Sequence, residues 1–170
     1  MSTLVLLPLD TVSFDAELPL AYQPQADAAA IAQALLGTRL ALSILARPAD
    51  SSEQAASLQR LEAKLDLALE LALQQRYPQA GQPTPCRVGL ESLCWLHPTP
   101  LDIGSSGIIS LQPRMPSALT VQLPLVILQC QPAGHGYAIV ASWGEHLGDA
   151  QADWERWVFR RHRQAIGRKA

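Results

Sequence analysis

The chain has 170 residues, of which 48% are hydrophobic and 16% are charged, and its formal net charge is −2. This apolar content is ample for the packed core of one domain, or of one domain plus an appendage. The small negative charge argues against nucleic acid or an anionic membrane as the main partner.

The N-terminal region carries no signal-peptide pattern. Leu4 to Leu9 is apolar, but no basic residues precede it and Asp10 follows it. No stretch approaches the roughly 20 apolar residues that cross a bilayer. The three cysteines form no Cys-x-x-Cys pair and have apolar neighbours, as small buried side chains do. They are Cys86, Cys94 and Cys130. We therefore expect a cytoplasmic protein without a membrane span.

Residues 1–50 are expected to form an N-terminal arm followed by short helices. Prolines interrupt the first half of this segment, which predicts an extended arm with at most short strands. They are Pro8, Pro19 and Pro24. Asp27 is suited to cap a helix that Gly37 ends. The apolar run from Leu40 to Leu45 is too short to assign by period, and we favour a second short helix there.

Residues 51–77 predict the clearest element, a long heptad helix. Ser51 can cap it, with Gln54 three residues later in a weak capping-box pattern, and no Gly or Pro follows before Arg76. Apolar residues recur at spacings of 3, 4, 3 and 4, the a/d seam of a coiled coil. The seam consists of Leu58, Leu61, Leu65, Ala68 and Ala72. Further leucines on the other sides favour cover by neighbouring chains, although an internal core helix also fits the pattern.

Residues 78–86 contain Pro and Gly and predict a linker. After it, apolar segments alternate with turns, and the predicted strands cover residues 87–96, 107–111, 119–129 and 137–143. Several short strands at this spacing are typical of an antiparallel barrel or sandwich. A last helix opens at Asp149, so we expect residues 87–170 to form an α+β domain.

The sequence shows no catalytic or metal-binding constellation. Its four histidines are scattered, without the spacing of a zinc site or of a known catalytic motif. They are His97, His135, His146 and His162. The turn from Asp102 to Gly107, with Gly104 inside it, can aim backbone N–H groups at an anion, but an ordinary tight turn needs glycine as well. We therefore expect no enzyme, no metal and no cofactor.

The C-terminal helix ends in a basic segment. Six of the 13 basic residues lie in the last fifteen positions. Cations there complement the helix dipole, or they form a patch for an acidic protein partner. The patch residues would be Arg160, Arg161 and Arg163. Nucleic acid is a poorer fit, because no aromatic platform for stacking bases lies beside them.

Three segments together resemble a known family. They are the helical stretch Leu61–Leu67, the stretch Arg87–Leu90 and the hydrophobic-then-basic stretch Trp157–Gln164. In these the sequence resembles PilZ-domain proteins, six-stranded bacterial barrels often built to bind cyclic di-GMP. More narrowly, it is similar to atypical, tetramer-forming PilZ proteins of pseudomonads and xanthomonads, in which a heptad helix precedes the barrel. The resemblance covers roughly residues 55–170 and implies a six-stranded antiparallel barrel with a long N-terminal oligomerisation helix and a C-terminal helix.

The nucleotide motifs of the family do not match this chain. The resemblance would require Arg-x-x-x-Arg before the barrel, whose guanidinium groups grip phosphates, but here Arg76 and Arg87 are eleven residues apart. The Asp/Asn-x-Ser-x-x-Gly motif can be placed on Asp102, Gly104 and Gly107, which leaves too few residues for the remaining strands.

The other placement of this motif, which fits the chain length better, falls on three residues that do not match it. They are Gly89, Glu91 and Cys94. The Glu91 carboxylate would repel the phosphates of a nucleotide. Under either placement the resemblance implies a broken nucleotide site.

The sequence therefore predicts a non-catalytic regulatory scaffold, a degenerate PilZ-like barrel carried on a homo-oligomer, as dimer or tetramer. By resemblance it would act with a regulatory protein partner in motility, type IV pilus or related signalling. The alternative is a cyclic di-GMP receptor with an unconventional binding set. That set would comprise Arg76, Arg87, Asp102, Gly104 and Gly107.

Overall fold

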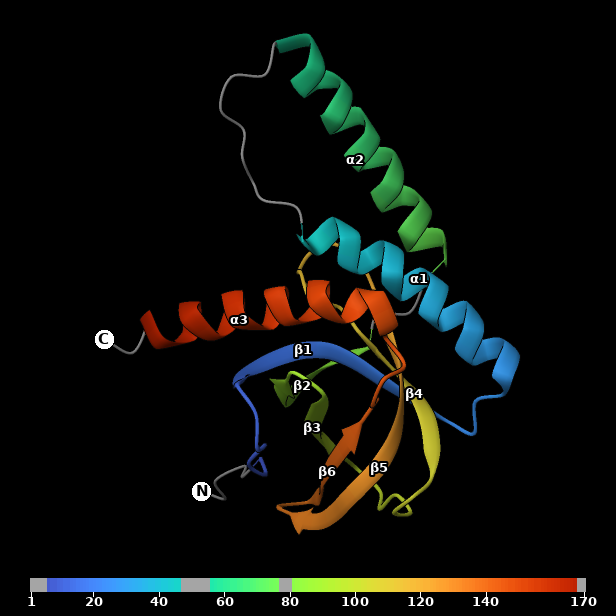
Figure 1. Ribbon diagram of the computed structural model, residues 1–170, viewed down its shortest axis with the longest axis vertical. Helices are drawn as coiled ribbons and strands as arrows, with labels where there is room; N and C mark the ends of the chain where they lie inside the picture. The colour runs from blue at the N-terminus through green and yellow to red at the C-terminus, as the bar shows by residue number, and fades with distance from the viewer. Residues whose placement is uncertain (1–5, 47–55, 77–80, 168–170) are drawn as a thin grey trace.

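The computed structural model describes residues 6–46, 56–76 and 81–167, and Figure 1 shows the arrangement of its helices and strands. The strands are β1 (Ser13–Pro24), β2 (Gln82–Gly89), β3 (Ser92–His97), β4 (Ser106–Leu111), β5 (Val121–Ala133) and β6 (Gly136–Ser142). The helices are α1 (Ala28–Ala46), α2 (Ala56–Arg76), the 3-10 turn η1 (Gly148–Ala150) and α3 (Gln151–Gly167). α1 and α3 cover one end of the strands, and α2 extends away from them.

The six strands form a closed antiparallel barrel in the order β1-β2-β3-β6-β5-β4. Closure pairs β1 with both β2 and β4, for example Phe14 opposite Val88 and Tyr22 opposite Ile109. Alternate side chains point inward, as the two-residue period of a strand requires, and form the main buried core, which includes Trp95. A closed barrel leaves no exposed sheet edge, so it is a self-contained unit.

The barrel begins at β1, which differs from the expected boundary at residue 87. The segment read as an extended arm is a 12-residue strand, and α1 and α2 are inserted between β1 and β2. The prolines fit this strand because Pro19 lies opposite Pro83, where two residues without N–H groups face each other. β2 also occupies most of the expected linker, and the predicted strand over 87–96 is in fact the β2–β3 hairpin.

α1 is one continuous helix, whereas two short helices were predicted around Gly37. Asp27 caps it as predicted, since its carboxylate accepts a hydrogen bond from the Ala30 N–H at 2.7 Å. The buried hydroxyl of Thr38 donates to the Gln122 carbonyl at 2.7 Å and accepts from the Gln122 N–H at 2.8 Å. This pair of bonds docks α1 onto β5 and offsets the cost of about 1 kcal/mol for glycine within a helix.

α1 also bears on the expected absence of a membrane span. By length and composition alone this 19-residue helix could cross a bilayer, so the expectation that no segment reaches that length is wrong. One face of α1 is buried against the rest of the chain, through Ala34, Ala41, Leu42 and Leu45.

α3 closes one end of the barrel through a cluster of tryptophans. Trp154 lies 5.1 Å from Trp143 and 5.0 Å from Trp157, between ring centroids. Its indole N–H donates to the Gly89 carbonyl at 3.1 Å. This contact joins the helix to the β2–β3 hairpin, so α3 is part of the core and its outer face alone is open to partners.

Candidate functional site

The exposed surface of α2 is the most unusual feature of the described structure. Among the α2 side chains that the structure describes, Glu70 and Leu73 are half-buried and the rest are exposed. The exposed set includes all five seam residues predicted from the heptad pattern: Leu58, Leu61, Leu65, Ala68 and Ala72. A helix this rich in exposed leucine leaves a large apolar surface in water, which in soluble proteins marks an interaction site.

α2 has three faces, because successive residues of an α-helix lie about 100° apart around its axis. Leu69, Glu70 and Leu73 lie on the face that meets the rest of the chain. The heptad seam lies roughly 120° to one side, and Leu67 and Leu71 lie roughly as far to the other side. Leu65, Leu67 and Leu71 are 61%, 63% and 54% exposed. Exposed leucines therefore lie on two faces of one helix, and Lys64, seven residues before Leu71, adds a charge to the second face.

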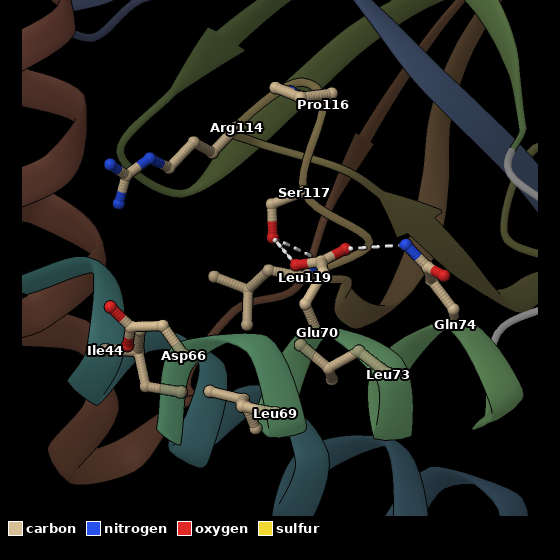
Figure 2. Close-up of a pocket in the computed structure, with 10 residues that line it drawn as sticks. All are labelled: Ile44, Asp66, Leu69, Glu70, Leu73, Gln74, Arg114, Pro116, Ser117 and Leu119. Carbon is tan, nitrogen blue, oxygen red and sulfur yellow. Dashed lines mark hydrogen bonds between the residues drawn. The ribbon is translucent and has the colours of Figure 1, made fainter. Parts of the chain in front are cut away.

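Glu70 attaches α2 to the segment before β5. Its carboxylate accepts hydrogen bonds from the Ser117 hydroxyl at 2.7 Å and from the Ala118 N–H at 2.6 Å, and Figure 2 shows it directed at Ser117. The bond from Ala118, and next that from Ser117, lower the pKa of Glu70 below its ordinary value. Gln74, one turn further on, adds a longer bond at 3.4 Å. No sequence pattern signals this site, because it depends on which loop meets the helix.

A cavity of about 510 Å³ lies between α2 and this segment. Its lining is mixed, with apolar Ile44, Leu69 and Leu119 beside the charged groups of Asp66 and Arg114. Figure 2 shows these side chains around the hydrogen-bonded Glu70. A second hollow of about 320 Å³ lies between α1 and α2 and is mostly apolar. α2 therefore rests on the body of the chain through partial packing only.

The arginines and the turn of the unconventional nucleotide set lie in separate places. Arg76 lines the hollow between α1 and α2. Arg87 instead forms a two-bond ion pair with Asp15, at 2.6 and 3.0 Å, and this bond raises the pKa of Arg87. The Asp102–Gly107 turn is bonded to β5 through the Gly104 N–H and the Ile127 carbonyl at 2.8 Å.

The other placement of the nucleotide motif falls on the β2–β3 hairpin, where the N-terminal segment covers part of it. Cys94 is fully buried and packs with Leu6, Leu7 and Leu9. Arg87 also donates to the Leu7 carbonyl at 3.1 Å. A side chain added at Gly89 would come within 2.8 Å of the Thr11 hydroxyl. The outer face at Cys94 is therefore occupied by the chain itself.

The three arginines of the predicted partner patch have different surroundings. Arg160 donates to the Leu45 carbonyl at 3.3 Å, at the C-terminal end of α1. Arg161 lies 5.6 Å from the ring centroid of Phe14, a cation–π contact. Arg163 is exposed. Arg160 therefore links α3 to α1, and Arg161 links α3 to β1.

Two of the three cysteines, Cys86 and Cys94, offer no reactive thiolate. Cys86 and Cys94 are fully buried and free. Burial raises the pKa of Cys86 to about 12 and also raises the pKa of Cys94. Because the thiolate is the reactive form, both side chains act as small hydrophobic groups in the core.

These observations define a class of protein: a small closed barrel sealed by a C-terminal helix, with an inserted helical pair that bears an open leucine surface. No protein-family model matches the chain, and a search of curated proteins gives no significant match. A search of solved structures gives a tetrameric PilZ domain from Xanthomonas campestris, described as self-assembled through an unusual helical bundle.

The two structures agree with a TM-score of 0.72 over 93% of this chain and 91% of that one, at 24% sequence identity. The chain therefore has the fold of a PilZ domain. The six-stranded PilZ-like barrel with long and C-terminal helices, expected from the sequence, is confirmed.

Proposed function

We propose that this chain is a non-catalytic scaffold that self-associates through α2 and presents its barrels to a regulatory protein partner. The observation that carries the proposal is the exposure of the entire heptad seam, together with Leu67 and Leu71 on a second face. A helix with exposed leucines on two faces fits a bundle in which each helix touches two neighbours. Four copies satisfy this arrangement more fully than two.

The structural neighbour supports the same assembly. Its description as a tetramer formed by a helical bundle concerns that protein, and we extend it to this chain because α2 offers the required surface. By resemblance, the scaffold would serve motility, type IV pilus function or related signalling in the cytoplasm. The buried face of α1 favours a helix of the domain over a membrane span.

The absence of nucleotide binding is part of the proposal. Arg87 is paired with Asp15, and Cys94, at the preferred motif position, lies beneath the N-terminal segment. The alternative, a cyclic di-GMP receptor, would require Arg76 and Arg87 to act together from different parts of the fold. Calorimetric titration separates the two, since micromolar binding that is lost in Arg87→Ala would favour the receptor.

The experiment that tests the scaffold is light scattering after size exclusion on Leu61→Asp/Leu65→Asp. We expect this variant to be monomeric, because two buried carboxylates would have to leave water in the bundle. The matched control is Ile103→Asp/Leu128→Asp, which makes the same chemical change at exposed barrel residues and should keep the native mass. An unchanged mass in the α2 variant would show that the seam does not drive assembly.

A further inference from the structure

α1 carries an exposed apolar stripe that the heptad pattern did not reveal. Leu36 and Leu40, one turn apart, are 64% and 63% exposed. The opposite face of α1 is fixed to the barrel by Thr38 and by buried Leu42 and Leu45. The stripe is therefore held rigidly and cannot turn inward to escape water.

This stripe and α2 together line one groove, which we call the inter-helix groove. It is the hollow of about 320 Å³ between the two helices. Its apolar lining is Leu36, Leu40, Ile44, Leu69, Leu73 and Leu119. Gln33, Arg76 and Thr120 also line the groove, but its exposed surface is mostly apolar and therefore favours an apolar occupant.

The inter-helix groove is continuous with the heptad seam of α2. At about 100° per residue, Leu69 lies roughly 40° around α2 from Leu65 of the seam. Leu69 lines the groove and is itself 39% exposed. The apolar surface thus runs without a break from the seam, across Leu69, to Leu36 and Leu40 on α1.

The size of the seam gives a reason for this extra surface. A stripe along the 21 residues of α2 is about 31 Å long and roughly 10 Å wide, or roughly 300 Å². Stable protein interfaces bury about 800 Å² on each partner. One face of α2 is a narrow strip on this scale, and the α1 stripe supplies additional apolar area beside it.

We infer that the inter-helix groove is an assembly surface, and that its occupant is α2 of a second copy of this chain. This inference rests on the proposed self-association through α2 and extends it to α1. In the assembly, seam leucines of the incoming helix lie against Leu36 and Leu40. Assembly is then specified by two helices of each copy, so a chain that shares the heptad but lacks this stripe would pack less stably.

The test is cross-linking between copies that carry different tags and different single cysteines. One copy carries Leu40→Cys and the other Leu65→Cys, both with Cys130→Ser, since the remaining cysteines are buried. After co-expression, a short bismaleimide is added and cross-linked pairs are captured on both tags in sequence. We expect an adduct that carries both tags, and none when the exposed barrel substitution Leu128→Cys replaces Leu40→Cys.

The outcomes separate this inference from the proposed function. One outcome is an oligomeric chain that gives no two-tag adduct, with the same dissociation concentration in Leu40→Glu as in wild type. This result would overturn the groove assignment but not the proposed self-association through α2. A monomeric native mass would overturn both. Flotation with phosphatidylcholine vesicles that Leu36→Glu/Leu40→Glu abolishes would assign the stripe to a lipid surface and also overturn the inference. We expect Leu40→Glu to raise the dissociation concentration about tenfold or more.

Discussion

The Glu70 carboxylate accepts a hydrogen bond from the Ser117 hydroxyl at 2.7 Å, and this contact joins helix α2 to the barrel. Glu70 belongs to the exposed helix α2, and Ser117 precedes β5 of the barrel. The Glu70–Ser117 bond and the bond from the Ala118 N–H together fix the orientation of α2 relative to the barrel. In an assembly built on α2, this contact sets the orientation in which each barrel is presented.

Replacing this carboxylate should loosen α2 without dissociating the assembly. In Glu70→Gln the charge that strengthens both bonds is lost, at a cost of about 1 kcal/mol in this near-surface setting. We expect an unchanged mass and a broader distribution of distances between spin labels on α2 and the barrel. Asp66→Asn, one turn earlier in the same cavity, is the control. A distribution as narrow as wild type would show that packing alone orients α2.

The same contact predicts a pH dependence. The pKa of Glu70 is lowered in the folded chain, so its stabilising effect is present above the ordinary glutamate pKa, about 4.3, and is lost as pH falls through the lowered value. The NMR shift of the Ala118 amide should therefore titrate with a midpoint below about 4.3 and show no such step in Glu70→Gln. A midpoint above the ordinary value would contradict the assigned hydrogen bonds.

Thr38→Val should destabilise the fold. The substitution preserves shape but leaves the N–H and carbonyl of Gln122 without their Thr38 partner, which costs about 1–3 kcal/mol for buried groups. Urea unfolding at fixed protein concentration measures the free energy of unfolding. Ser43→Ala, on an exposed part of α1, should change it by no more than about 0.5 kcal/mol. Equal effects of the two substitutions would refute the docking of α1 through Thr38.

Two substitutions of Trp154 separate the contribution of its hydrogen bond to stability from the contribution of its packing. Trp154→Phe removes the N–H that donates to Gly89 and should cost about 1 kcal/mol for the bond, plus a smaller packing loss. Trp154→Ala leaves a cavity beneath α3 and should cost about 3–5 kcal/mol. Thermal unfolding of both variants measures this order, and a Trp154→Phe loss as large as that of Trp154→Ala would contradict it.

Local sequence patterns predicted most helices and strands but not how the strands pair to close the barrel. Alternating residues and turn signals located β4, β5, β6 and α3 to within a few residues. β1 was missed because its prolines argue against a strand, and only its pairing with β2 shows that Pro19 faces Pro83. β1 precedes α1 and α2 in the chain but closes the barrel by pairing with β2 and β4. A short stretch of sequence cannot reveal such long-range pairing.

Part of the candidate interaction surface could likewise be predicted from the sequence, and part could not. The seam of α2 follows from heptad spacing alone, and its five residues are exposed in the structure. The stripe of Leu36 and Leu40 was invisible because α1 was split at Gly37, and tertiary packing overrides that break. Arg160 and Arg161 read as a surface patch from their charge, yet their partners Leu45 and Phe14 lie more than 100 residues earlier in the chain.

Assembly of this chain through α2 is tested most directly by its native mass, measured by sedimentation equilibrium over a dilution series. We expect a species of about four times 18.4 kDa that persists to low micromolar concentration and is unaffected by cyclic di-GMP. A mass of 18.4 kDa across the series would contradict it, because the exposed leucines of α2 would then have no partner in another copy.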